Sequence, residues 1–246
     1  MSTTAELIAQ LEHSDAGRRR QAALALGSSG DETAAPALVA RLGSEANSCV
    51  REDLTWATVQ MIDATLPAVL AMLISENPDD RRTGAHVLSK VGDPAHFERL
   101  APLVDDQHPD VAIKAYRALA NTAAPQAPAL LATRLGDGDA LQRDALSAAF
   151  CRLGEPAVPV LVEALDASEA RVREHAAEAL GYLGGAAAAA AAALTTSALT
   201  DEAAEVRLMA ASALRQLGEA AIEGLGQLSG SSDATVAAVA GRSLTC

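Results

Sequence analysis

The adjacent pair Glu174–His175 is the arrangement in this sequence that could best begin a metal site. Carboxylate and imidazole groups are ligands that non-haem iron uses in proteins. The four other histidines do not repeat this pair at matching positions along the chain. Because a two-iron site needs several such ligands, we expect no metal and no other cofactor, and we expect His175 to be a surface imidazole on a helix.

Residues that could act as nucleophiles lack the surroundings that such chemistry needs. Cys49, Cys151 and Cys246 lie far apart and form no CxxC pair, which favours a reducing compartment over a disulfide framework. The chain contains neither the GxxxxGK[ST] loop that holds phosphates nor the GxSxG turn of hydrolases. We therefore interpret Cys49 and Cys151 as small packing residues and expect no catalytic residue.

A repeated helical pattern must position any functional side chain in this chain. The stretch VREHAAEALGYLGG, residues 172–185, places apolar residues on one helical face and ends in glycine. Related stretches, spaced by 30 to 34 residues, begin at residues 18, 50, 80, 111, 142, 206 and 236. An apolar helical stretch precedes each of them, and polar links join the two. Such a period is typical of a stack of helical hairpins, so we expect an all-α chain with no internal domain boundary.

The second helix of each copy carries the pattern D-x-x-VR-x-x-AA-x-ALG-x-LG, which is clearest at Val172–Gly184 and Val206–Gly218. On this pattern the chain resembles the HEAT-repeat family, in particular its short bacterial form, the PBS-lyase HEAT-like repeats. The resemblance implies a single solenoid domain over residues 1–246, a right-handed α-α superhelix of about eight hairpins. The repeated arginine is found at Arg19, Arg51, Arg81, Arg143, Arg173 and Arg207. We expect each arginine to pair with an acidic or backbone group of the neighbouring unit.

The resemblance also predicts where a partner would bind, because second helices line the concave face of HEAT stacks. We expect the second, third, sixth and tenth places after each start to face solvent. In units two to four these places supply cations between acidic flanks, and the single tryptophan. The candidate partner-binding residues are Asp53, Trp56, Arg82, His86, Lys90, Lys114 and Arg117. Tryptophan and arginine often anchor interfaces, and a cationic strip suits an acidic helix or tail. The alternative is an ordinary solvated surface with Trp56 buried between units.

Composition narrows the classes of partner. The formal charge is −13, which disfavours binding to nucleic-acid phosphates. The N-terminus lacks the basic and apolar regions of a signal peptide. The uncharged stretch 179–200 is long enough to cross a bilayer, but alanine, glycine, serine and threonine gain little from hydrocarbon. We therefore expect a cytoplasmic chain that binds neither nucleic acid nor a membrane.

These features favour a non-enzymatic scaffold or adaptor of bacterial origin. It would bind a protein or peptide, in particular one with an acidic segment, on its concave face. The family name supplies an alternative, a bilin lyase-like protein or lyase subunit that acts on a chromophore-carrying partner. The identity of the partner, the pathway and the oligomeric state remain open at this point.

Overall fold

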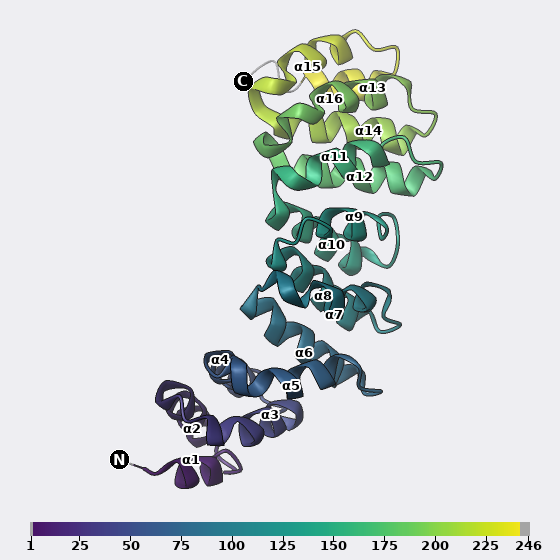
Figure 1. The fold of residues 1–246 in the computed structure, drawn as a ribbon. Coiled ribbons are helices and arrows are strands. Elements are labelled where there is room, and N and C mark those ends of the chain that lie inside the picture. Colours follow the sequence, from purple (N-terminus) through teal and green to yellow (C-terminus); the bar gives the residue numbers. More distant parts are fainter. Residues whose placement is uncertain (1, 242–246) are drawn as a thin grey trace. The chain divides into compact units, whose positions relative to one another are not determined.

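The chain folds into helices throughout the part that the structure describes. The computed structural model describes residues 2–241, and no strand is found among them. The helices form two compact units, Met1–Thr122 and Ala123–Cys246, and each unit contains four helical hairpins (Figure 1). The predicted all-α repeat architecture is confirmed, whereas the expectation of one domain over residues 1–246 stays a prediction.

Successive hairpins of the first unit stack through their second helices. The first helices are α1 (Thr4–Gln10), α3 (Ala35–Ser44), α5 (Ile62–Leu73) and α7 (Phe97–Leu100), the last continued by a 3₁₀ segment (Ala101–Asp105). The second helices are α2 (Ala16–Ser29), α4 (Ser48–Gln60), α6 (Pro78–Val91) and α8 (Pro109–Thr122). Helix α4 packs against α2 and α6, and α8 packs against α6, so these helices form one continuous layer.

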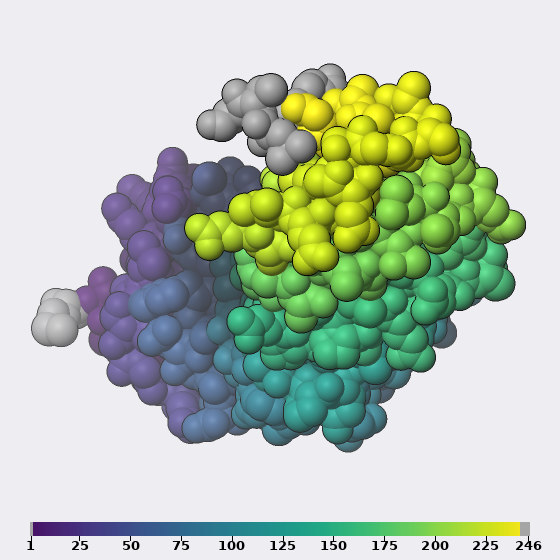
Figure 2. Space-filling view, turned by 90° about the horizontal axis from the view of Figure 1, so that it is seen from above, coloured from purple at the N-terminus to yellow at the C-terminus, as the bar shows by residue number. Residues whose placement is uncertain are grey.

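The second unit repeats this arrangement. Its first helices are α9 (Ala127–Ala132), α11 (Val158–Ala164), α13 (Ala191–Thr200) and α15 (Ile222–Ser229). Its second helices are α10 (Ala140–Leu153), α12 (Ala170–Leu183), α14 (Ala204–Leu214) and α16 (Ala234–Gly241). Helix α12 packs against α10 and α14, and α14 also packs against α16. In the space-filling view the consecutive colours of this unit, teal to yellow, lie in adjoining bands, as expected for layers that contact their neighbours in sequence (Figure 2).

The repeat pattern predicts the register of every second helix. All eight second helices begin two residues before the start assigned from the sequence. Several begin directly after a capping side chain, because the first N–H groups of a helix have no partner inside it. Asn47, for example, accepts from the N–H of Cys49 at 3.0 Å and from that of Val50 at 3.2 Å. The polar links of the sequence therefore set where the second helices begin.

Glycine and alanine allow the second helices to approach closely. A Cβ atom on Gly27 would lie 2.9 Å from Ala57 Cα, and one on Gly181 would lie 3.0 Å from Ala213 Cα. The two glycines occupy the same place in their repeats, as do the two alanines. Because ordinary Cβ contacts are longer than this, a larger residue at either glycine would push the layers apart.

One apolar stretch, Ala170–Thr200, is long enough to cross a membrane by length and composition. In the structure it consists of α12, a 3₁₀ segment (Gly184–Ala190) and α13. Gly184 has a φ of 55°, a left-handed value that ends the α-helical geometry. The stretch also contains the buried side chain of Arg173. We interpret it as consecutive repeat elements, as the sequence predicts.

Candidate functional site

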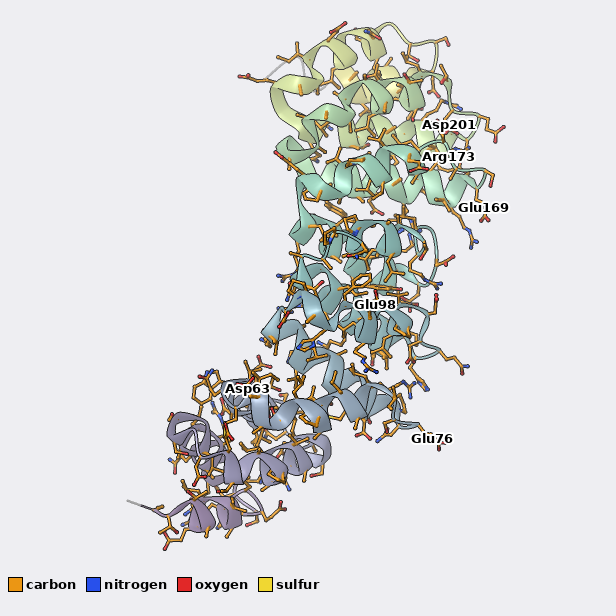
Figure 3. The ribbon with its side chains drawn as sticks, viewed as in Figure 1. Asp63, Glu76, Glu98, Glu169, Arg173 and Asp201 are labelled. Carbon is orange, nitrogen blue, oxygen red and sulfur yellow. The ribbon has the colours of Figure 1, made fainter. Side chains whose placement is uncertain are left out.

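Four of the repeated arginines join neighbouring hairpins. Arg173 donates from Nε and Nη2 to the two carboxylate oxygens of Asp201, at 2.8 Å each (Figure 3). Its Nη1 donates to the carbonyl groups that close the preceding turn, at 2.9 and 3.0 Å. The corresponding pairs are Arg19–Glu45, Arg81–Asp106 and Arg207–Asp233. For these four arginines the predicted pairing with the neighbouring hairpin is confirmed.

The position of the acidic partner explains why these pairs recur. Glu45, Asp106 and Asp201 each lie three residues before the first residue of the next second helix. Each carboxylate also accepts the backbone N–H of the residue two positions further on, at 2.8 to 2.9 Å. One side chain therefore fixes the turn and holds the arginine of the preceding hairpin. We call an acidic residue at this position, three residues before the next second helix, the ladder acid.

Three of the repeated arginines have no ladder acid. For Arg207 the position is filled by Ser231, and Asp233, directly before α16, supplies the carboxylate instead. For Arg143 the position is filled by Ala167, and the guanidinium lies 3.7 Å from Glu178 and 3.9 Å from Glu174. For Arg51 the position is filled by Ser75. The Ser75 hydroxyl donates to Asp80 at 2.8 Å, and the Arg51 guanidinium makes a hydrogen bond of 3.3 Å to the carbonyl of Glu45.

Arg51 borders a pocket of about 170 Å³ in the first unit. We call it the Arg51 pocket. Its lining from α3 and α4 is Leu42, Ser48, Arg51, Glu52 and Thr55; α6 adds Arg82, Thr83 and His86, and α8 adds Lys114. The pocket thus unites Arg82, His86 and Lys114 of the predicted site. Arg51 itself was not predicted as a site residue from the sequence. That Ser75 replaces the acidic partner of Arg51 can be recognised only when the position of the ladder acid before α6 is known.

Glu52 links α4 to α6 at the edge of the pocket. It accepts from Lys90 Nζ at 2.7 Å, and its other carboxylate oxygen lies 3.0 Å from His86 Nε2. These two groups lower the pKa of Glu52 to about 2. Burial lowers the pKa of His86, while Glu52 acts in the opposite direction. His86 Nδ1 is buried and has no hydrogen-bond partner in the described part of the chain.

The predicted cationic strip consists of Arg82, Lys90, Lys114 and Arg117, and acidic groups among the described residues pair with only two of these four side chains. Lys90 pairs with Glu52, and Arg82 lies 3.1 Å from Asp79. Lys114 and Arg117, by contrast, form no ion pair within residues 2–241. The pKa of Lys114 is lowered by burial and by the positive charge of Arg117 and Arg82. Uncompensated positive charge therefore gathers on α8.

Trp56 lies on the same layer of second helices and is 40% exposed. It borders a shallow groove together with Leu24, Val59 and the side chain of Lys90. One edge of the indole rests on α2, where a Cβ atom on Gly27 would lie 2.6 Å from Trp56 Cζ3. Trp56 is therefore not fully buried, whereas the alternative of an ordinary solvated surface is not tested by this geometry.

Asp53 of α4 forms an ion pair with Arg20 of α2, within the first unit. Its carboxylate accepts from Arg20 Nε, and its side chain is 17% exposed. Together with Trp56 it borders the shallow groove, whereas Arg117 lies exposed on α8. That these side chains bind a partner remains a prediction.

Three expectations about individual side chains are wrong. His175 is fully buried: the Gly136 N–H donates to its Nδ1 at 3.0 Å, and its Nε2 lies 3.2 Å from the Arg143 carbonyl. Burial and Arg143 lower the pKa of His175 to about 4. Cys49 and Cys151 are exposed rather than packed, and Cys246 lies outside the described residues. Over residues 2–241, no group of three or more histidine, cysteine, aspartate or glutamate side chains is placed to hold a metal ion.

Sequence comparison identifies the repeats. A family model described as HEAT repeats matches residues 1–58, 66–149, 141–215 and 158–245, which together span most of the chain. A search of proteins with curated descriptions gives no match.

Comparison with solved structures gives matches that include the following three. Kap121p, in a mutant form, aligns with a TM-score of 0.60 and 12% identity over 98% of this chain and 33% of its own, so the present chain spans about a third of that protein. The complex of CpcE and CpcF of phycocyanin lyase from Nostoc sp. PCC7120 aligns with a TM-score of 0.45 and 22% identity, over 92% and 93% of the two chains. Human deoxyhypusine hydroxylase aligns with a TM-score of 0.40 and 20% identity, over 98% and 94%.

Proposed function

The chain belongs to the HEAT-repeat family, and from this premise we propose that it is a non-enzymatic scaffold that binds a protein or peptide with an acidic segment. The binding surface is the layer of second helices α4, α6 and α8, and the contact residues are Asp53, Trp56, Arg82, His86, Lys90, Lys114 and Arg117. The proposal places the chain in the bacterial cytoplasm, in keeping with its sequence.

The observation that carries the proposal is a partly exposed tryptophan on α4 and, two second helices further on, cations on α8 that form no ion pair within the described residues. The exposed part of Trp56 borders a groove with Leu24, which is itself 40% exposed. An apolar side chain of a partner would remove this surface from water. Lys114 and Arg117 would then attract a neighbouring carboxylate, because an ion pair relieves the repulsion between them.

The fold supplies the rigidity that such a surface needs. Glu52 and Arg20 connect α4 to its two neighbours, through Lys90 and Asp53 respectively. A surface held in this way loses little conformational entropy when a partner binds. We therefore expect binding without a large rearrangement of the first unit.

The test is selection from a peptide library, followed by measurement of the selected peptides. We expect acidic peptides that carry one apolar anchor residue, and their affinity should fall at least about tenfold in Trp56→Ala and in Arg117→Glu. Tyr182→Ala removes an exposed aromatic side chain elsewhere and Arg99→Glu makes the same charge change on α7, so both should leave the affinity unchanged. Equal losses in the controls and in the site variants would contradict the proposal.

A further inference from the structure

The Arg51 pocket contains hydrogen-bond donors that the described residues do not satisfy. The guanidinium of Arg51 makes one hydrogen bond to the described residues, to the carbonyl of Glu45. Arg81 and Arg173 make the same kind of carbonyl bond and have a carboxylate as well, which Arg51 lacks within residues 2–241. Lys114 makes no side-chain hydrogen bond to the described residues and is half-buried. The carboxylate nearest Arg82, that of Asp79, is 73% exposed and is thus a weak competitor for the guanidinium. Partly buried cations with so few partners call for an anion.

The charge balance of the lining also favours an anion. Arg51, Arg82 and Lys114 contribute three positive charges. Glu52 is the acidic residue of the lining, and it is already bonded to Lys90 and His86. The chain as a whole carries −13, but charges farther away than about 8 to 10 Å are largely screened at physiological salt. The local potential is therefore decided by the three cations of the lining and by the nearby carboxylates of Glu52, which is paired with Lys90, and Asp79, which is mostly exposed.

We propose that the Arg51 pocket is an oxyanion-binding site that takes a phosphate group, either inorganic phosphate or a phosphate monoester. A guanidinium can donate two parallel hydrogen bonds to phosphate, and an ammonium group adds a compact charge. Arg51 and Lys114 are the principal ligands, and Arg82 completes the positive wall. The hydroxyls of Ser48 and Thr83 line the same pocket and add donors that carry no charge.

A dianion fits this lining better than a carboxylate does. Three cations against one acidic residue leave an excess of two positive charges, which a phosphate neutralises and a single carboxylate does not. The volume of about 170 Å³ is large enough for a small anion with some of its water. The inference goes beyond the proposed scaffold function, since a phosphate ion can be tested without any protein partner.

The first experiment is calorimetric titration of the full chain with inorganic phosphate at low ionic strength. We expect saturable binding at one site, and at least about tenfold weaker binding in Arg51→Gln and in Lys114→Gln. Arg99→Gln removes the same charge from α7, outside the pocket, and should bind phosphate as the wild type does. The absence of saturable binding, or equal affinities in Arg51→Gln and Arg99→Gln, would overturn the proposal.

A second variant separates loss of binding from loss of folding. In Ser75→Asp/Asp80→Val, residue 75 becomes a ladder acid, and residue 80 takes the valine that most other copies have at this place. The new carboxylate should capture Arg51, as Asp106 captures Arg81. We expect thermal stability to be retained or increased while phosphate affinity falls at least about tenfold. Unchanged phosphate binding in this folded variant would remove Arg51 from the site and refute the proposal.

Peptides then distinguish the two sources of the phosphate group. Tighter binding of a phosphoserine peptide than of inorganic phosphate supports a phosphorylated protein, and binding of inorganic phosphate alone supports a free phosphate or small ester. A preference for glutamate over phosphoserine at the same position contradicts a phosphate site. Acidic peptides that depend on Trp56, found together with no saturable binding of inorganic phosphate, would overturn the pocket and leave the scaffold function intact.

Discussion

Arg173 and Asp201 lie 28 residues apart in the chain and face each other through two hydrogen bonds of 2.8 Å (Figure 3). Both side chains are less than a tenth exposed. The pair joins the second helix of one hairpin to the turn that begins the next second helix. Because the same geometry recurs in both units, it offers the most direct test of how the layers are held together.

We expect Asp201→Asn to lower the free energy of unfolding by about 3 kcal/mol, because it leaves a buried guanidinium without its counter-charge. Glu202→Gln is the matched control: Glu202 lies 3.6 Å from the same arginine, but its side chain is 87% exposed. Its effect should stay within about 0.5 kcal/mol. Urea denaturation followed by circular dichroism measures both variants, and equal effects would show that the pair contributes little.

His175 should make the stability of the chain depend on pH. Its pKa is about 4 in the folded chain and 6.5 in an unfolded one, so the unfolded state binds more protons between these values. The folded state is therefore favoured in full above pH 6.5 and loses up to about 3 kcal/mol as the pH falls to 4. Arg143 acts in the same direction as burial, and Asp144 opposes it.

Urea denaturation at several pH values tests this prediction, and the readout is the slope rather than the absolute stability. His175→Gln should flatten the slope between pH 4 and 6.5, whereas replacement of the exposed His108 by glutamine should not. A variant slope equal to that of the wild type would show that His175 does not titrate as described.

The pKa of the His86 imidazole should move in opposite directions when an acidic or a basic neighbour is removed. Glu52 on α4 raises its pKa, whereas Lys114 on α8 and Lys90 on its own helix lower it. We therefore expect the pKa of His86 to fall in Glu52→Gln and to rise in Lys114→Gln. Titration of the imidazole signals by nuclear magnetic resonance measures both shifts, and shifts of the same sign would contradict the described arrangement.

Gly27→Ala tests the contact between α2 and α4. The added methyl group would lie 2.6 Å from Trp56 Cζ3 and 2.9 Å from the backbone of Ala57, so we expect a loss of about 1 to 3 kcal/mol. The fluorescence of Trp56 should change as well. Gly226→Ala is the control, because a Cβ atom there meets nothing within 4 Å and alanine favours a helix by about 0.5 to 1 kcal/mol. Destabilisation by both substitutions would mean that the glycine of α2 has no special packing role.

The repeat period made the fold predictable from one sequence. The pattern that begins at Val172 occurs in eight copies. Because the copies are aligned with one another, a residue that departs from the pattern in one copy does not shift the predicted start of the others. The start of every second helix is therefore predicted to within two residues. The pairing of Arg19, Arg81, Arg173 and Arg207 could be predicted for the same reason. The partner-binding residues and the alternative bilin lyase role are not tested by the fold and stay predictions.

The face of the second helix was harder to predict. The third place after each start was expected in solvent, yet Thr83 and His175 are buried there and Asp53 is only 17% exposed. On a helix this place adjoins the starting residue and the seventh place after it, and most of these residues are buried. Whether it faces water depends on how closely the next second helix approaches, and one sequence does not specify that distance. The missing acidic partner of Arg51 could not be predicted either, because the position of that partner is defined by where the next second helix begins and how it packs.

The missing ladder acids also bear on how the chain would respond to mechanical force. Pulled from its two ends, a stack of hairpins yields at the junctions that resist least. At Ser75 the Arg51 guanidinium has no carboxylate to hold it across the junction, whereas at Asp106 and Asp201 two hydrogen bonds must break together. At Ala167 the Arg143 guanidinium still lies 3.7 Å from Glu178 of the next second helix. Under tension the first unit would therefore come apart first beside Arg51, and a phosphate bound at Arg51 would strengthen this junction.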